Sequence, residues 1–395
     1  MGQRSPAESP HRPAPTANSS WPSRTEWAGA LDAARELALD YLSSIPEAPV
    51  SHHAAPSDLA PRFDDPLPAI GCSPDEALRE WFARAEPGIV RSPGPRYFGF
   101  VTGGSTPAAL AGDWLASALD QNAAGWLFSP AATQTELATI RWLLDLFGLP
   151  GSWSGALTTG ATMANLCGLA AARHWASREL GFDAARDGLG GRPSIPVLGS
   201  TEVHQSAIKA LGVLGLGRNA LHTISARDGV IDLDGLERAL AVIDGPAIVI
   251  ANAGEVNTGA FDPIRAIAER CAAHDPGAWL HVDAAFGLYA VLSPAHAHLL
   301  DGLALADSIA SDAHKWLNVP YDCGFVLVRN AASLRGAFAA AAAYLNLDEA
   351  PVGWDAFDYV PEISRRFRAL SVWCALRAAG RAGYAEIVTR SIANA

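Results

Sequence analysis

AIVIANAGEVNTGAFDPIRAIAERCAAHDPGAWLHVDAAF, residues 247–286, holds two short apolar runs separated by a segment with helical spacing. The runs at 247–253 and 278–286 have the length and apolar content of buried strands. The segment 263–274 between them fits an amphipathic helix. Two strands joined through a helix are the repeating unit of a parallel sheet, so this stretch predicts an α/β fold.

The same alternation extends along most of the chain from about residue 110. Further strands are predicted at 195–201, 307–313 and 324–330, and further helices at 131–147, 162–180, 204–214 and 234–243. The pattern predicts an α/β domain with a mainly parallel sheet and helices on both faces. Ligands of such sheets bind at the C-terminal ends of the strands, so polar residues at those ends are candidate site residues.

Composition excludes several classes of protein. The 395 residues are 49% hydrophobic and 18% charged, as in a compact protein, and the net charge of −12 argues against a nucleic-acid partner. The longest apolar run near the end of the chain, GAFAAAAAYL, is about half the length needed to span a bilayer, and the N-terminal residues lack the apolar core of a secretory signal. Five scattered cysteines without CxxC spacing favour reduced thiols in a cytoplasmic protein.

The first candidate site feature is LTTGATMANLCGLAAAR, residues 157–173, where a β-prone run meets Gly160 and a helix that Thr162 can cap. No Asp or Glu lies between Gly155 and Arg173, although helix N-termini favour acidic side chains. The free N–H groups are therefore open to an external anion such as phosphate. An ordinary capped core helix is the alternative.

The second feature is His204 in STEVHQSAIKALGVLGLG, residues 200–217, which ends a strand and begins a helix. A flat imidazole at the C-terminal end of a strand can lie against a planar ligand. A helix-capping or hydrogen-bonded core histidine is the alternative.

The third feature is Asp283 in WLHVDAAFGLYA, residues 279–290, at the end of an apolar strand. Asp is rarely buried without a partner, so a carboxylate here needs a cation or a strong donor. The small residues after it leave space for a flat group, and His281 points to the same side by strand alternation. An Asp that caps the next helix is the alternative.

The fourth feature is SDAHKWLNVPYDCGF, residues 311–325, where Lys315 follows a strand and precedes Trp316 and Leu317. Apolar neighbours remove water from the amine, which lowers the pKa of a lysine and favours a nucleophile able to form a Schiff base. A surface lysine at the start of a loop is the alternative. All four features together fit one planar cofactor that carries an aldehyde, a phosphate and a ring nitrogen, namely pyridoxal 5′-phosphate.

From about Pro95 to Gly380 the chain resembles the pyridoxal-phosphate-dependent group II amino-acid decarboxylases, which include aromatic-amino-acid, histidine, glutamate and cysteine-sulfinate decarboxylases. The motifs that carry the resemblance, in order, are RYFGF (aromatic segment near the substrate), TTGATMAN (phosphate loop), HQSAIKA (H-x-S-x-x-K-A), HVDAAFG (H-V-D-A-A), SDAHKW (lysine motif) and SRRFRALSVWCALRAAG (long helix after the mobile loop). In this order the motifs are highly specific. The resemblance implies the aspartate-aminotransferase-like fold (fold type I) with a mainly parallel seven-stranded sheet.

The resemblance also implies a role for each matched residue. Lys315 would hold the cofactor as a Schiff base, and Asp283 would keep the ring nitrogen protonated. His204 would stack on one face of the ring and Ala285 would pack on the other. The predicted cofactor-binding residues are Gly160, Ala161, Thr162, His204, Asp283, Ala285, Asp312, His314 and Lys315. Within this set Ala161, Thr162 and His314 would hold the phosphate, and Asp312 stands where some members carry Asn.

The predicted reaction is decarboxylation of an L-amino acid to an amine and CO2 through a quinonoid intermediate. Tyr344 would protonate the substrate carbon, and it favours plain decarboxylation because members that make aldehydes tend to have Phe there. Tyr97, Phe98 and Phe100 are predicted to lie near the substrate and favour an aromatic or apolar side chain. ANAGEVNTGAFDP departs from the family's A-T-x-G-T-T, because Glu255 and Val256 replace two hydroxyl residues expected near the cofactor's ring hydroxyl.

Three alternatives stay open at this point: an aminotransferase or a carbon–carbon lyase on the same fold, and a catalytically weak, truncated homologue. No metal site is predicted, because His296 and His298 have no third ligand at a suitable spacing.

The Pro and Ser content of residues 1–25 and their lack of apolar periodicity predict a disordered tail. The resemblance implies that a helical dimerisation segment (26–103) and a cofactor-binding α/β domain (104–346) follow. Residues 347–395 would hold the rest of the mobile loop and a helix over Ile363–Ala379 that leads into a truncated C-terminal domain. Within the dimerisation segment, helices are predicted at Trp27–Ile45 and at 74–86, where Ser73 caps the helix and Pro74 begins it. We expect a homodimer with its active site at the subunit interface, an amino-acid substrate, and no nucleic-acid or membrane partner.

Overall fold

The computed structural model describes residues 22–51, 54–339 and 353–395. The chain divides into two units, Met1–Gly99 and Phe100–Ala395. The division falls close to residue 103, where the N-terminal segment was expected to end. Residues 353–395 belong to the large unit.

The small unit is helical. It contains α1 (Arg24–Ser44), α2 (Pro56–Leu59) and α3 (Pro74–Ala85), with 3₁₀ turns η1 (Ala60–Arg62) and η2 (Glu86–Gly88). Ser23 and Ser73 cap α1 and α3 through reciprocal hydrogen bonds with the Glu residue three positions later. The predicted cap at Ser73 and the predicted start at Pro74 are therefore confirmed.

The large unit is built on a seven-stranded sheet with the strand order β1-β9-β8-β7-β6-β2-β3. Its strands are β1 (Ser154–Thr158), β2 (Val197–Ser200), β3 (Leu221–Ile224), β6 (Ala247–Asn252), β7 (Ala278–Asp283), β8 (Ser308–Asp312) and β9 (Gly324–Val328). Strands β3, β2, β6, β7 and β8 are parallel, and β9 runs antiparallel between β8 and β1. A small hairpin of β4 (Ala226–Arg227) and β5 (Val230–Ile231) forms a second sheet. The mainly parallel seven-stranded sheet is confirmed.

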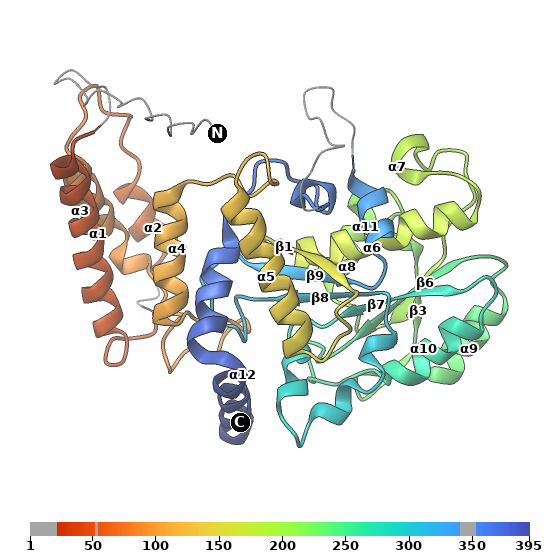
Figure 1. Cartoon of the computed structure of the whole chain (residues 1–395). Coiled ribbons are helices and arrows are strands. Elements are labelled where there is room, and N and C mark those ends of the chain that lie inside the picture. Colours follow the sequence, from red (N-terminus) through yellow and green to blue (C-terminus); the bar gives the residue numbers. More distant parts are fainter. Residues whose placement is uncertain (1–21, 52–53, 340–352) are drawn as a thin grey trace, which may run out of the picture. The chain divides into compact units, whose positions relative to one another are not determined.

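Helices cover the sheet and flank it (Figure 1). They are α4 (Pro107–Leu119), α5 (Pro130–Leu146), α6 (Ala161–Glu179), α7 (Ala184–Asp187), α8 (Gln205–Val213), α9 (Leu233–Ala241), α10 (Ile264–Ala273), α11 (Ala331–Phe338) and α12 (Arg368–Asn394). Short 3₁₀ turns lie between them: η3 (Arg218–Ala220), η4 (Gly287–Leu292), η5 (Ala297–Leu300), η6 (Leu303–Leu305) and η8 (Ala356–Asp358). Helix α6 packs across β7, β8 and β9, and α10 packs on β6 and β7.

Helix α12 differs from the predicted helix over Ile363–Ala379. It begins at Arg368 and ends at Asn394, with a break at Gly380, whose φ is 62°. It begins late because Arg365 is buried and its guanidinium binds the carboxylate of Glu136 at 2.8 Å, which holds the preceding segment away from a helical path. It continues past Gly380 because Tyr384 and Val388 are buried in the core.

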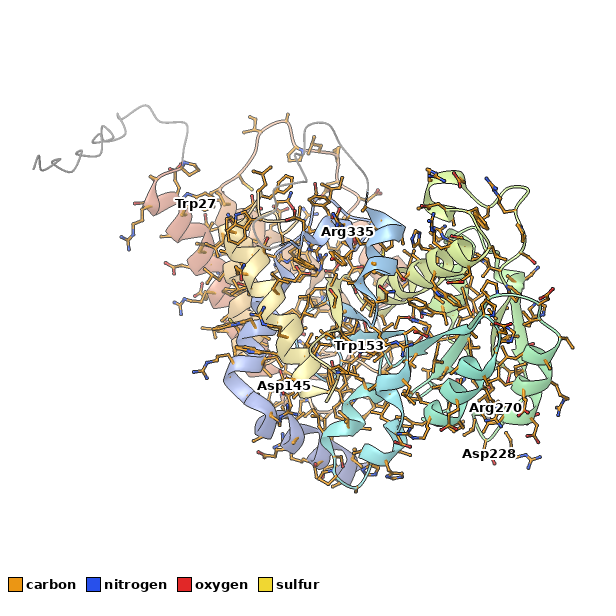
Figure 2. The ribbon with its side chains drawn as sticks, turned by 45° about the vertical axis from the view of Figure 1, so that its right-hand side comes forward. Trp27, Asp145, Trp153, Asp228, Arg270 and Arg335 are labelled. Atoms are coloured by element: carbon orange, nitrogen blue, oxygen red, sulfur yellow. The ribbon has the colours of Figure 1, made fainter. Side chains whose placement is uncertain are left out.

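The core lies between the sheet and its helices. The inner strands β6, β7, β8 and β9 are buried along their whole length, which explains why their sequences are continuous apolar runs and do not alternate. Figure 2 shows Trp153, which is 5% exposed, among the packed side chains, whereas Asp228 and Arg270 lie toward the periphery. Within the described ranges, no helix has the length and apolar character to cross a membrane.

Candidate active site

The predicted site residues follow the C-terminal ends of four strands. Asp283 ends β7 and pairs in register with Asn252 of β6 and Ala310 of β8, so these ends lie side by side. Lys315 follows β8, His204 follows β2, and Gly160 follows β1. All four strands point the same way, because β9 is antiparallel to both β8 and β1. The topology therefore brings residues from distant parts of the sequence to one edge of the sheet.

These residues line one cavity of about 440 Å³. All of the predicted cofactor-binding residues contribute to it: Gly160, Ala161, Thr162, His204, Asp283, Ala285, Asp312, His314 and Lys315. A volume of this size suits a small organic ligand.

Asp312 lies in the part of the cavity next to the N-terminus of α6 and contacts three groups there. Its Oδ1 accepts a hydrogen bond from the Ala161 N–H at 2.5 Å, and its Oδ2 lies 3.1 Å from Lys315 Nζ. His314 Nε2 is 3.4 Å from the same carboxylate, and the His314 ring lies against Tyr321 with centroids 4.2 Å apart. Burial lowers the pKa of His314, although the charge of Asp312 opposes the shift. Lys315 is mostly buried as expected, but it forms an ion pair and is not an isolated amine.

Asp283 has a different environment. It is 7% exposed and accepts hydrogen bonds from Asn165 Nδ2 at 2.9 Å and from the Ala285 N–H at 3.2 Å. Burial raises the pKa of Asp283, while these hydrogen bonds and the charge of Lys315 act in the opposite direction. Both contacts come from neutral donors, so the carboxylate is suited to a cationic ligand group.

The sequence left two roles open for His204, namely helix capping and contact with a planar ligand. His204 is the N-cap of α8, and its Nδ1 accepts a hydrogen bond from the Ser206 N–H at 3.2 Å. Its ring also lines the cavity, together with Ala285. The capping bonds fix the orientation of the imidazole at the cavity wall.

Sequence reasoning missed two polar residues. Asn165, inside the TTGATMAN motif, contacts Asp283 directly, and Asn252 lines the cavity at the end of β6, where its Nδ2 donates to Ser200 Oγ at 3.2 Å. The available signal was a single amide within an otherwise apolar helix or strand. Glu255 also lines the cavity, but its carboxylate accepts the N–H groups of Asn257 and Thr258 in its own loop. Burial alone would raise the pKa of Glu255, and these hydrogen bonds lower it overall.

The roles predicted for Tyr97, Phe98, Phe100 and Tyr344 stay predictions. Tyr97 and Phe98 belong to the small unit, and the Phe98 ring is 94% exposed. Phe100 begins the large unit with its ring 92% exposed, and the neighbouring Val101 lines the cavity. Tyr344 lies outside the described residues.

The residues present fit pyridoxal phosphate. The first turn of α6 carries no acidic residue, and a Cβ on Gly160 would come within 3.3 Å of His314 Cε1, so the glycine keeps this approach open. His314 Nδ1 is buried without a hydrogen-bond partner among the described residues, as an atom that awaits a ligand would be. Lys315 would offer an amine to the aldehyde, and Asp283 would offer a carboxylate to the ring nitrogen.

Comparisons with known proteins agree with this fit. Residues 56–395 match the family model described as the pyridoxal-dependent decarboxylase conserved domain. The aromatic-L-amino-acid decarboxylase of Bacillus atrophaeus is 31% identical over 364 residues, which cover 90% of this chain and 73% of that protein. The L-2,4-diaminobutyrate decarboxylase of Rhizobium meliloti is 34% identical over 338 residues, 84% of this chain and 65% of that protein.

Solved structures show the same architecture. The structure of Oryza sativa TDC with PLP and tryptamine superposes with a TM-score of 0.85 at 29% identity and covers 92% of this chain and 76% of that chain. Mouse CSAD gives a TM-score of 0.85 at 27% identity and covers 94% of this chain and 78% of that chain.

Proposed function

This chain belongs to the pyridoxal-dependent decarboxylase family and is a pyridoxal-phosphate-dependent amino-acid decarboxylase; we propose that its substrate is an L-amino acid with an aromatic or apolar side chain. One observation carries this choice. Lys315 is the only Lys or Arg among the described residues that line the cavity, and Lys315 is needed for the cofactor. Apolar and aromatic side chains supply much of the remaining wall: Val101, Met163, Val256, Phe286 and Tyr321. An acidic side chain would have no cationic partner there.

The cofactor roles proposed for individual residues follow from their surroundings. When bound, pyridoxal phosphate supplies an electron-withdrawing ring that stabilises negative charge on the substrate's α-carbon. Asp283 is the proposed counterion of the ring nitrogen, because it is a buried carboxylate held by neutral donors. The N-terminus of α6 with Thr162 and His314 is the proposed phosphate site, and His204 and Ala285 are the proposed groups against the two faces of the ring.

Proton handling centres on Lys315 and Asp312. Lys315 Nζ is the proposed anchor for the cofactor's aldehyde. Whenever Nζ is free, Asp312 Oδ2, 3.1 Å away, would hold it as an ammonium group and keep its proton within the site. Tyr344, outside the described residues, stays the predicted donor of the proton that replaces CO2.

A panel of amino acids tests the proposed substrate class. We expect CO2 release from L-phenylalanine, L-tyrosine or L-tryptophan to exceed that from L-glutamate by on the order of 10²-fold, because an unpaired buried charge costs several kcal/mol. The amine should form in equal amount, whereas a keto acid or an aldehyde in its place would indicate an aminotransferase or a carbon–carbon lyase. Faster turnover of glutamate would contradict the proposal.

A basic amino acid is a second candidate substrate. Glu202 and Glu255 both line the cavity, and their carboxylates could hold a second amino group. A relative that is 34% identical carries the name L-2,4-diaminobutyrate decarboxylase. If this candidate is right, Glu202→Gln should lower turnover of 2,4-diaminobutyrate about tenfold and leave turnover of aromatic substrates unchanged.

We also propose that the protein is a homodimer whose active site lies at the subunit interface. In the small unit, the only apolar residues buried among those described are Ala33 and Ile45, although α1 exposes Leu31 by 56% and Leu39 by 53%. Helices with so little buried surface gain stability only from a further contact surface. Sedimentation should give twice the chain mass, and a monomer with full decarboxylase activity would contradict this proposal. All five cysteines are free, which supports the predicted cytoplasmic location.

A further inference from the structure

A chain of buried polar side chains connects β7 and β8 to α6 and α8 beneath the cavity. It begins at Trp279, whose indole N–H can only donate a hydrogen bond. Trp279 Nε1 donates to Ser308 Oγ at 2.8 Å. The hydroxyl of Ser308 has one proton, and the next polar atom within reach is His281 Nδ1, also at 2.8 Å. Because a hydroxyl can also accept twice, the direction of this bond is set at the other end of the chain. There the Ser206 N–H makes His204 Nδ1 an acceptor, so Ser206 Oγ donates to it and accepts from Asn165 Nδ2, which leaves Asn165 Oδ1 facing His281 Nε2. Ser308 therefore donates to His281 Nδ1.

The hydrogen bond from His281 to Asn165 of α6 runs in the same direction. His281 is fully buried, and burial lowers its pKa to about 3, so near neutral pH the imidazole holds a single proton. Because Nδ1 accepts, that proton is on Nε2, which donates to Asn165 Oδ1 at 2.8 Å. The Asn165 amide is thereby oriented with its Nδ2 group facing away from His281.

Asn165 divides the chain into two branches. Its Nδ2 donates to Asp283 Oδ2 at 2.9 Å and to Ser206 Oγ at 3.0 Å. Because Ser206 Oγ accepts from Asn165, its own proton is free for His204 Nδ1 at 2.7 Å. The Ser206 backbone N–H, which can only donate, reaches the same nitrogen at 3.2 Å. His204 Nδ1 is thus an acceptor, and Nε2 carries the proton.

We propose that Asn165 is a positioning residue, the branch point of a one-directional hydrogen-bond chain from Trp279 that holds Asp283 as an acceptor and His204 in its Nε2-protonated form. An amide suits this point, because it accepts on one side and has two N–H groups on the other. The consequence for the cofactor rests on the roles proposed above for Asp283 and His204. The directions of the hydrogen bonds do not depend on those roles.

Gly168 provides an independent observation. It lies one turn after Asn165 inside α6, where glycine is unfavourable for a helix. A Cβ at this position would come within 2.6 Å of His281 Cε1 and 2.7 Å of His281 Nδ1. The glycine therefore makes the space that His281 needs to reach Asn165.

The first test reads the protonation of the two histidines directly. In the cofactor-loaded enzyme labelled with ¹⁵N-histidine, two-bond proton–nitrogen spectra distinguish Nδ1–H from Nε2–H, and the variants His204→Gln and His281→Gln assign the two signals. We expect both histidines to be neutral with the proton on Nε2. A proton on Nδ1 of either residue would overturn the proposal.

The second test compares two replacements of His281 by cofactor titration. Gln can still donate to Asn165 Oδ1, whereas Leu leaves that oxygen without a donor and frees the amide to turn its oxygen toward Asp283. We expect His281→Leu and Asn165→Leu to weaken cofactor binding roughly tenfold or more, as for loss of a hydrogen bond to a charged group, with His281→Gln within about threefold of the native protein. Ser371→Ala is the matched control, because it removes a buried hydroxyl that binds Ala109 O away from this chain of contacts.

Equal weakening by His281→Gln and His281→Leu would overturn the proposal, since the donor would then not matter. If the Leu variants do not fold, the histidine spectra of the native enzyme still decide the directions. If Asp283→Ala binds the cofactor like the native protein, the proposed role of Asp283 fails, while the measured proton positions continue to test the chain of hydrogen bonds alone.

Discussion

Asp283 and Asp312 end the neighbouring strands β7 and β8 and line the same cavity, yet their surroundings differ. Asp283 accepts hydrogen bonds from neutral groups, an amide and a backbone N–H. Asp312 touches Lys315 and the N-terminus of α6, which carry a positive and a partial positive charge, and it lies close to His314, whose pKa is lowered by burial. The Asp283 region therefore suits an external cation. In the Asp312 region the protein's own carboxylate lies where an external anion is expected.

The largest effect should come from Lys315→Ala. The chain has two lysines, Lys209 and Lys315, and only Lys315 lines the cavity of the proposed cofactor site. Removing the amine removes the proposed anchor, so we expect CO2 release to fall by about 10⁴-fold or more. The absorbance of bound cofactor after dialysis should also be lost. Lys209→Ala is the matched control and should keep both signals, and a Lys315→Ala variant that keeps its activity would exclude the proposed role.

The next largest effect should come from Asp283→Asn. The substitution keeps the shape of the side chain and one acceptor oxygen but removes the charge proposed to face the ring nitrogen. We expect decarboxylation to fall on the order of 10²–10³-fold at saturating cofactor, because the charge stabilises the transition state. Steady-state CO2 release with a parallel cofactor titration measures both effects. A loss confined to cofactor affinity would show that Asp283 binds the cofactor without assisting the reaction.

The strands that carry the two aspartates, and the cavity where they meet, could be predicted from the sequence. The strands were predictable because β6, β7, β8 and β9 are buried on both faces, and the predicted site residues gathered because they follow strand ends on one edge of the sheet. The prediction that His281 points to the same side as Asp283 is confirmed, since both contact Asn165. That result follows from the strict alternation of a strand.

Contacts between residues far apart in sequence could not be predicted. Asn165 and Asp283 are 118 positions apart, and Arg365 and Glu136 are 229 apart, so no local pattern marks either pair. The start and end of α12 depend on such contacts. Arg365, which pairs with Glu136, lies just before the first residue of the helix, and Tyr384, after the break at Gly380, is buried in the core. The pairing of Lys315 with Asp312 depends on the path of a turn, which apolar neighbours alone did not reveal.

His281 contacts Asn165, which in turn binds Asp283, and the neutral state of His281 can be tested through the pH dependence of stability. His281 stays neutral in the folded protein to about pH 3, whereas in the unfolded chain it takes up a proton near its usual pKa of 6.5. Below that value the unfolded state binds one more proton, so the free energy of unfolding should fall by about 1.4 kcal/mol per pH unit from this group. Urea unfolding at several pH values should show a shallower decline for His281→Gln. Equal slopes would mean that His281 is protonated in the folded protein.

The smallest effect, and one of opposite sign, should come from Asp312→Asn. The Asn side chain can still accept the hydrogen bond from the Ala161 N–H, which is 2.5 Å from Asp312 Oδ1, but it no longer repels a phosphate at the N-terminus of α6. We expect cofactor and inorganic phosphate to bind about threefold to tenfold more tightly, consistent with loss of one screened like-charge contact. Asp312→Ala, which also removes the acceptor for Ala161, should not show this gain. Asp283→Asn should weaken cofactor binding in the same titration, so the two isosteric substitutions separate the two regions by sign. If Asp312→Asn weakens binding as much as Asp312→Ala, the carboxylate is itself a required partner of Lys315 and His314, and the two aspartates serve the cofactor in the same way.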